Sequence, residues 1–302
     1  MYDQITANKR RSALLVAAFV ALVGAVGWAA SLVLGYGLAG LVVAVVLAGA
    51  GSVVAWWKSD AIALRVSRAR PAGEVDCARL HNLVEGLCIA GGLPKPRLYV
   101  VDDDAPNAFA TGRDPRHAAV AVTTGLLDKL NRVELEGVLA HELSHVKNYD
   151  TLVSTLAVTL LGALTLLSDV SLRLLWWGGP GHRDHRRGRA GPAAILGVVG
   201  MVLLLVAPLI GRMMQLAVSR RRELLADVSG VSLTRYPPGL IAALEKLRDE
   251  PTVVRSASRA TAHLWIESPL ARTAAEGQGA RLNRLFDTHP PLEERISALR
   301  EL

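Results

Sequence analysis

Two histidines lie four residues apart within residues 141–145, whose sequence His-Glu-Leu-Ser-His is an H-E-x-x-H motif. On an α-helix, residues i and i+4 lie one turn apart on the same face, so the imidazoles of His141 and His145 can bind one zinc ion. Glu142 flanks that face and can reach a water molecule bound to the metal. The spacing therefore predicts two zinc ligands and a general base, the arrangement that metalloproteases use to hydrolyse peptide bonds.

A catalytic zinc ion usually has three protein ligands and one water molecule, so a third ligand must come from elsewhere in the chain. Glu223 is the candidate, because it stands four residues before Asp227 and this spacing places both carboxylates on one helical face. Glu223 would bind the metal, and Asp227 would fix a ligand histidine. The alternative is a surface glutamate paired with Arg220 or Arg222, and the presence of the H-E-x-x-H motif favours the metal site.

The motif must lie on a helix, which the sequence predicts from residue 131 to about residue 148. Asn131 followed by Glu134 is typical of a capping box at a helix start. One side of the helix carries the apolar residues Val133, Leu135, Val138, Leu139, Leu143 and Val146. The motif lies off most of this stripe and is expected to face a cleft. Because Glu134, Glu136 and Lys147 lie on the same helix, it is too polar to span a membrane.

The composition indicates membrane segments as well. The chain has 302 residues, of which 51% are hydrophobic, and its mean hydropathy is +0.31. Residues 12–57 contain no Asp, Glu, Lys or Arg. A transmembrane helix needs about 20 residues, so two spans joined by a turn near residues 35–37 fit into this run. The run is too long for the apolar part of a cleaved signal peptide.

Basic residues flank this apolar run and account for much of the formal charge of +7. The flanking residues are Lys9, Arg10 and Arg11 on one side and Lys58, Arg65, Arg68 and Arg70 on the other. In a hairpin both groups lie on one side of the membrane, which the positive-inside rule makes the cytoplasm. No basic stretch is interleaved with aromatic residues as in single-strand binding proteins. We therefore expect a lipid bilayer, and no nucleic acid, among the partners.

Between these features, residues 58–93 are predicted to be helical, and β-strands are predicted at residues 97–101 and 118–123. Two further apolar segments, residues 151–168 and 193–211, are marginal spans by length. Because the third ligand must return to the motif, the chain crosses the membrane there twice or not at all. These two segments either span the bilayer or lie partly embedded beside the site.

The chain is expected to have four parts. They are an N-terminal transmembrane hairpin (1–57), a catalytic part with the H-E-x-x-H helix (58–150), a second hydrophobic hairpin (151–218) and a C-terminal catalytic part with the third ligand (219–302).

The motifs together resemble those of the M48 metallopeptidases, and within them the HtpX-type membrane proteases. The matching pieces, in order, are the N-terminal apolar pair, residues 107–110, residues 141–145, the second apolar pair, residues 219–227 and residues 288–290. They cover nearly the whole chain, and the ordered set is more specific than the H-E-x-x-H motif alone. Leu224 departs from the family, in which an aromatic residue often follows the third ligand, and this difference affects packing more than metal binding.

The resemblance implies that His141, His145 and Glu223 bind one zinc ion per chain and that Glu142 is the catalytic base. It also implies that Asp227 supports the metal site. In such a site Glu142 accepts a proton from the attacking water and passes it to the leaving amine, without a covalent acyl-enzyme.

The resemblance also implies that Asn107, Ala108 and Phe109 bind substrate, because in such proteases this segment borders a cleft where an edge strand can pair with an extended peptide. Asn107 would hold the substrate backbone, or alternatively form a turn before the strand. His289 would stabilise the oxyanion or orient the substrate, or alternatively serve as a structural histidine before Pro290.

We therefore expect a mainly α, α+β zincin-like metalloprotease domain with transmembrane helices, in a multi-pass protein of the cell membrane that hydrolyses peptide bonds at the cytoplasmic face. By resemblance alone, its substrates are misfolded or damaged membrane proteins and its role is proteolytic quality control. A scaffold that keeps zinc for structure is an alternative that the presence of Glu142 does not favour. An intramembrane protease would carry the motif in an apolar helix, and a transporter would carry polar residues within its spans.

Overall fold

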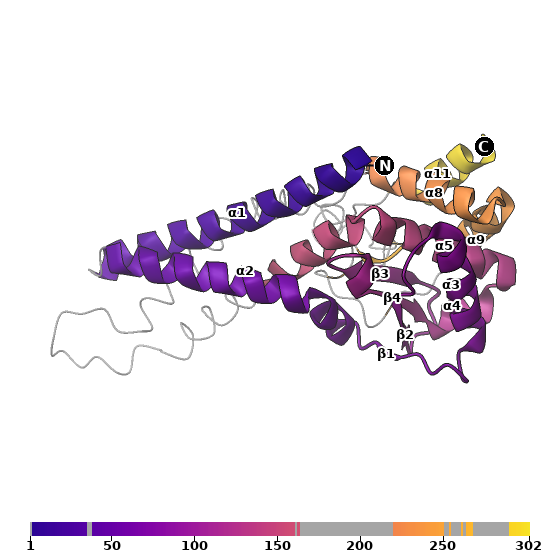
Figure 1. Cartoon of the computed structure of the whole chain (residues 1–302), viewed down its shortest axis with the longest axis horizontal. Coiled ribbons are helices and arrows are strands. Elements are labelled where there is room, and N and C mark those ends of the chain that lie inside the picture. The colour runs from indigo at the N-terminus through magenta and orange to yellow at the C-terminus, as the bar shows by residue number, and fades with distance from the viewer. Residues whose placement is uncertain are drawn as a thin grey trace, which may run out of the picture.

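The computed structural model describes residues 2–34, 38–160, 162–163, 220–250, 254, 261, 264–267 and 290–302. Two long helices, α1 and α2, lie side by side and project from a globular part that holds the β-sheet and the other labelled helices (Figure 1). The mainly helical, α+β architecture with apolar helices near the N-terminus is confirmed.

The projecting arm consists of α1 (Tyr2–Leu34) and α2 (Leu38–Val66), and both are long and apolar enough to cross a membrane. Their contact buries one stripe of α1, which contains Leu15, Phe19, Leu22 and Val26. Large apolar side chains of α2 are exposed, among them Val42, Val43, Val46, Leu47, Val53, Val54 and Trp57. An apolar surface of this kind suits lipid rather than water. The division of the chain into four parts stays a prediction, and its boundary at residue 57 falls inside α2.

The prediction of a helix over residues 58–93 is wrong for residues 67–77. Arg68 adopts a left-handed conformation, with φ of 54°. The amide of Ala69 donates to the carbonyl of Leu64 at 2.9 Å, the bond of a Schellman motif that ends α2. Strand β1 (Arg70–Pro71) follows, and its proline cannot donate a helical hydrogen bond. The helix resumes only as α3 (Ala78–Gly91), which ends at Gly92.

The sheet has four strands in the order β1-β2-β4-β3. Strands β2 (Arg97–Val101) and β4 (Ala118–Thr123) pair in parallel, and both were predicted. Strand β3 (Ala108–Gly112) pairs antiparallel with β4 and forms the last strand of the sheet on this side. A short 3-10 helix, η1 (Pro115–His117), lies in the connection between β3 and β4. On its other edge, Phe109 of β3 forms an isolated antiparallel bridge with Trp265, so a short segment of the same chain lies beside this strand.

Helix α5 (Arg132–Lys147) carries the H-E-x-x-H motif and begins at the predicted capping box. Asn131 Oδ1 accepts hydrogen bonds from the amides of Val133 and Glu134, and Glu134 Oε2 accepts one from the amide of Asn131 at 2.8 Å. Helix α4 (Thr124–Lys129) precedes α5. These local bonds fix where the helix starts, and so fix which side chains lie on its inner face.

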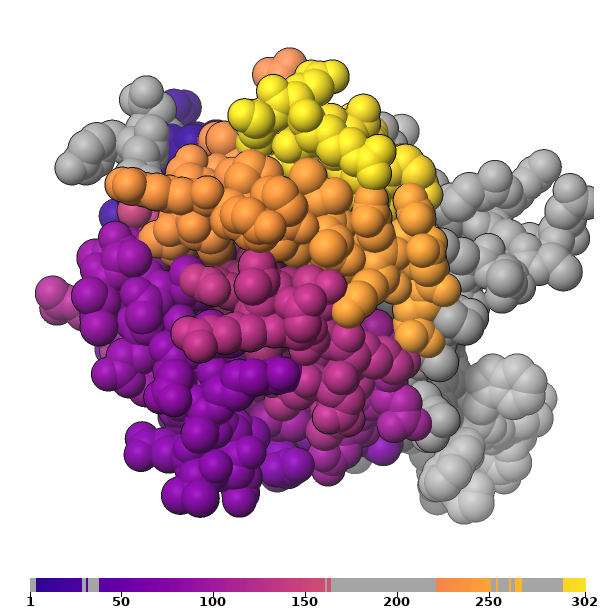
Figure 2. Space-filling model, turned by 90° about the vertical axis from the view of Figure 1, so that its right-hand side faces the viewer, coloured from indigo at the N-terminus to yellow at the C-terminus, as the bar shows by residue number. Residues whose placement is uncertain are grey.

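The structure describes three helices in the C-terminal part of the chain, within residues 220–250 and 290–302. They are α8 (Arg220–Thr234), α9 (Pro237–Asp249) and α11 (Leu292–Arg300). Figure 2 shows residues 220–250 (orange) between the C-terminal residues (yellow) and the magenta segment that includes α5. A common apolar core joins α5, α8, α9 and α11 with one face of the sheet.

A helix that spans Asp150–Leu160 follows α5, and its Val153, Ala157 and Leu160 pack into the apolar cluster of α1 and α2. This helix is the first part of the apolar segment 151–168. The second apolar segment, 193–211, lies outside the described residues, so the path of the second hairpin stays a prediction.

The close approach of α8 to α5 at Gly230 can be tested by substitution. A Cβ atom on Gly230 would lie 2.9 Å from the backbone nitrogen of His141, so an alanine must push the helices apart. We expect Gly230→Ala to lower the free energy of unfolding by about 1–3 kcal/mol. Gly86 of α3 is the matched control, because a Cβ atom there meets nothing within 4 Å. Gly86→Ala should raise stability by about 0.4–1 kcal/mol, and equal melting temperatures for the two variants would contradict the close contact.

Candidate metal centre

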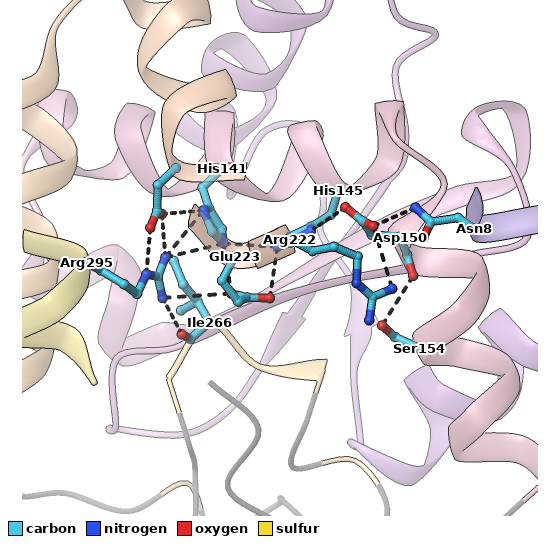
Figure 3. A network of polar contacts seen from close by, with 10 residues as sticks. Asn8, His141, His145, Asp150, Ser154, Arg222, Glu223, Ile266 and Arg295 are labelled. Atoms are coloured by element: carbon cyan, nitrogen blue, oxygen red, sulfur yellow. Dashed lines mark hydrogen bonds and ion pairs between the residues drawn. The ribbon is translucent and has the colours of Figure 1, made fainter. Parts of the chain in front are cut away.

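The side chains of His141, His145 and Glu223 converge, although α8 follows α5 by more than 70 residues. The two Nε2 atoms lie 3.1 Å apart. The carboxylate oxygens of Glu223 lie 3.8 Å from Nε2 of His141 and 3.6 Å from Nε2 of His145. Two ligand atoms that are each about 2.0–2.1 Å from a tetrahedral zinc ion lie about 3.3 Å apart. The three residues therefore fit one zinc ion. Figure 3 shows how their side chains lie relative to one another.

Both histidines are held through the other ring nitrogen by a buried carboxylate. Nδ1 of His141 lies 2.8 Å from Asp227, and Nδ1 of His145 lies 3.1 Å from Asp150. A carboxylate at Nδ1 fixes the proton there, orients the ring and leaves the lone pair of Nε2 for a metal. Asp227 was predicted in this role, and Asp150 was missed. The sequence feature that could have indicated Asp150 is its place: it is an acidic residue at the start of an apolar helix, five residues after His145.

Arg295 of α11 was also missed, and it is the most deeply buried charge near the site, with 0% of its surface exposed. Its Nε and Nη2 atoms donate to the two oxygens of Asp227 at 2.8 and 2.6 Å, and its Nη1 donates to the carbonyl of Ile266 at 3.0 Å. A bidentate pair of this kind holds the carboxylate in one orientation. The sequence feature that could have indicated Arg295 is its place among the buried positions of α11, which are otherwise apolar: Leu292, Ile296 and Leu299.

The two candidate ligand histidines have opposite electrostatic surroundings. Burial lowers the pKa of His141 to about 4, and Arg295 adds to this effect against the opposing charge of Asp227. Burial also opposes a charge on His145, but Glu223, Asp150 and Glu142 together outweigh it and raise its pKa to about 9. Burial opposes the charge of Asp227 in the same way, yet Arg295 and His141 keep its pKa below the usual value. The carboxylates around His145 therefore stabilise a positive charge at this side of the centre.

A small cavity of about 30 Å³ lies between the candidate ligands and the sheet. This volume is enough for a water molecule. The lining residues include Ala110, His141, Glu142, His145, Glu223 and the segment from Leu264 to Ile266. Glu142 is 2% exposed, so its carboxylate borders the cavity from within the protein. The predicted base and the predicted ligands thus share one cavity.

The structure places the three residues that were predicted to bind substrate against a segment of the same chain. Asn107 Nδ2 donates to the carbonyl of Glu267 at 3.0 Å, and the amide of Ile266 donates to the carbonyl of Ala108 at 2.9 Å. The ring of Phe109 packs edge-on against Trp265, with 4.7 Å between the centroids. These residues hold the segment 264–267 beside the last strand, where Leu264, Trp265 and Ile266 line the cavity. His289 lies outside the described residues.

Comparisons with known proteins show the family to which the chain belongs. Residues 74–302 match the family described as Peptidase family M48. Proteins named Protease HtpX homolog are similar over the whole chain: 40% identical in Streptococcus gordonii, over 100% of both chains, and 44% in Tropheryma whipplei strain Twist, over 100% of this chain and 98% of the relative. The crystal structure of S. mikatae Ste24p aligns with a TM-score of 0.47 and 18% identity, over 82% of this chain and 55% of that chain.

The pKa values of the histidines predict that zinc binding releases a proton. Below a pH of about 9, His145 is charged in the metal-free protein and must lose its proton to bind zinc, whereas His141 with a pKa of about 4 is already neutral at pH 7. We expect at least about one proton released per zinc ion at pH 7, and an apparent affinity that rises with pH up to about 9. Calorimetry in buffers of different ionisation enthalpy measures this number. Binding without proton release would contradict the assignment.

The role of Arg295 can be tested against a second arginine of the same helix. Arg295→Leu leaves the buried carboxylate of Asp227 without its bidentate partner, so we expect a loss of about 3–5 kcal/mol in the free energy of unfolding. Arg300 pairs with Glu245 at the surface, where its side chain is 64% exposed. Arg300→Leu should cost less than about 1 kcal/mol. Denaturant unfolding compares the two variants, and equal losses would show that Arg295 does not stabilise the buried carboxylate.

Proposed function

The chain belongs to peptidase family M48 and is a metalloprotease, and from that premise we propose that it is an integral membrane zinc endopeptidase. One observation supports the proposal most directly: ligand atoms of His141, His145 and Glu223 lie within 4.8 Å of one another. Glu142 borders the same cavity. Polypeptides are the substrates that membership of a peptidase family implies.

Each residue of the centre has a distinct role in the proposed reaction. His141 and His145 would hold one zinc ion through Nε2, and Glu223 would hold it through its carboxylate. Zinc, when bound, supplies a Lewis acid that acidifies a water molecule and polarises a carbonyl. Glu142 accepts the proton of the water that attacks the peptide carbonyl and then donates this proton to the leaving amine nitrogen. Asp227 and Asp150 hold the ligand rings in place during the reaction.

The substrate is proposed to enter beside β3. We infer that Asn107, Ala108 and Phe109 contribute to substrate binding by holding the segment 264–267, because this segment lines the cavity next to the candidate ligands. We also propose that His289 stabilises the oxyanion or orients the substrate, as the resemblance to the M48 family implies.

The catalytic part is proposed to lie at the cytoplasmic face. Lys9 lies over the ring of Tyr149 in the globular part, and Arg65 is in the last turn of α2, where the arm joins that part (Figure 1). Both basic flanks therefore lie at the catalytic end of the arm, and the positive-inside rule assigns this end to the cytoplasm. A metal centre close to two helices that are apolar enough to cross a membrane suits substrates that are themselves in the membrane. We propose misfolded membrane proteins as substrates, and a role in their quality control.

The proposed function predicts a specific effect of removing the base. Glu142→Gln should keep one zinc ion per chain and lose about 10²–10⁴-fold in kcat, because the amide cannot accept the proton of the attacking water. Hydrolysis of casein and of a destabilised membrane protein by the purified chain in detergent measures the effect.

Glu136→Gln is the matched control, since it makes the same chemical change on the same helix away from the cavity. It should leave both zinc content and kcat unchanged. Zinc content is measured in both variants, so that loss of the base is distinguished from loss of the metal. A Glu142→Gln protein that is as active as the wild type would contradict the proposal.

A further inference from the structure

A buried asparagine stands at the catalytic end of the membrane helix α1. Asn8 is 1% exposed and belongs to the buried side of the helix, which carries Asn8, Ser12, Leu15, Phe19, Leu22 and Val26. These positions recur every three or four residues, so Asn8 occupies a place where the pattern elsewhere has mainly apolar side chains. Burying an amide costs free energy unless its hydrogen bonds are satisfied. The partners of Asn8 therefore indicate why a polar residue stands there.

Both N–H groups of the Asn8 amide are used. Nδ2 donates to the carbonyl of Asn148 at 2.9 Å and to Oδ1 of Asp150 at 2.7 Å. A carbonyl and an ionised carboxylate only accept hydrogen bonds, so the orientation of the amide is fixed by chemistry. Between these two partners, Tyr149 has a left-handed φ of 60°, and Lys9 lies 5.0 Å from the centroid of its ring. Helix α1 thus contacts three successive residues of the turn that ends the H-E-x-x-H helix.

The second oxygen of the same aspartate holds a metal ligand. Oδ2 of Asp150 lies 3.1 Å from Nδ1 of His145, and Oδ1 lies 3.7 Å from Nη1 of Arg222. Asp150 is 4% exposed, so water does not compete freely for its carboxylate. In Figure 3, Asp150 lies between Asn8 on one side and His145 on the other. The carboxylate therefore connects the membrane helix to the metal centre.

We propose that Asn8 is a positioning residue of the metal centre, so that the membrane helix α1 completes a site whose ligands all come from the globular part. Asn8 fixes one oxygen of Asp150, which leaves the other oxygen aligned with the imidazole N–H of His145. The carboxylate that orients a ligand histidine usually affects metal affinity by about 10–100-fold. Asn8 contacts this carboxylate and not the histidine itself, so its effect on metal affinity is expected to be smaller. The inference rests on the proposed zinc site.

The test measures zinc affinity in the whole chain, purified in detergent, by competition with a chelator. We expect Asn8→Ala to weaken zinc binding about threefold to tenfold. It should also change the visible spectrum of the cobalt-substituted protein, because the ring of His145 is less well oriented. Ser12→Ala is the matched control. Ser12 is equally buried one turn further along α1, and its hydroxyl has no hydrogen-bond partner among the residues that the structure describes.

Ser12→Ala should leave both the zinc affinity and the cobalt spectrum unchanged. A lower melting temperature of Asn8→Ala, with zinc affinity and cobalt spectrum as in the wild type, would overturn the inference, because it would indicate a merely structural role. If the wild-type chain itself bound no zinc, the proposed function would fail first, so the two failures are distinguishable.

A double-mutant cycle tests the route of the effect. If Asn8 acts through Asp150, Asn8→Ala should change zinc affinity little in an Asp150→Ala background, and the two substitutions should be strongly non-additive. Independent, additive effects of the two substitutions on zinc affinity would overturn the proposed route.

Discussion

The packing of α8 against α5 brings several buried charges together, and the surrounding elements have to compensate them. Glu142, Glu223, Asp227 and Asp150 are each at most 6% exposed. A carboxylate buried without compensating charge costs several kcal/mol. Arg295 of α11 supplies part of the compensating positive charge, because its guanidinium donates hydrogen bonds to both oxygens of Asp227. A divalent cation between the two Nε2 atoms and Glu223 would supply much of the rest.

The same requirement explains why parts of the chain that are distant in sequence meet at one place. The C-terminal helix contributes a guanidinium that binds Asp227, and the N-terminal membrane helix contributes an amide that binds Asp150. Each of these groups contacts a carboxylate, and that carboxylate contacts the Nδ1 atom of one candidate ligand histidine. The two histidines thus have equivalent support from opposite ends of the chain. Under the proposed role of Asn8, the arm of α1 and α2 contributes to the metal centre as well as to the proposed attachment to the membrane.

The sequence predicted the parts of the site that depend on spacing within one helix. In any α-helix, residues four apart lie on the same face, and this holds for His141 with His145 and for Glu223 with Asp227. The capping box predicted where α5 begins. The place of Arg295 and Asn8 within buried stripes marks them as buried polar residues, but their roles could not be predicted, because the partner of each lies on another element. The end of α2 was missed for a similar reason, since the left-handed conformation of Arg68 is a property of that turn and not of arginine.

Zinc K-edge X-ray absorption on the purified chain tests the central claim most directly, because it reports the ligands of the metal themselves. The arrangement of His141, His145 and Glu223 predicts one zinc ion per chain with a four-coordinate shell of nitrogen and oxygen at about 2.0–2.1 Å, two of whose ligands are imidazoles. A shell that contains sulfur at about 2.3 Å, or that lacks two imidazoles, would contradict the assignment of this centre.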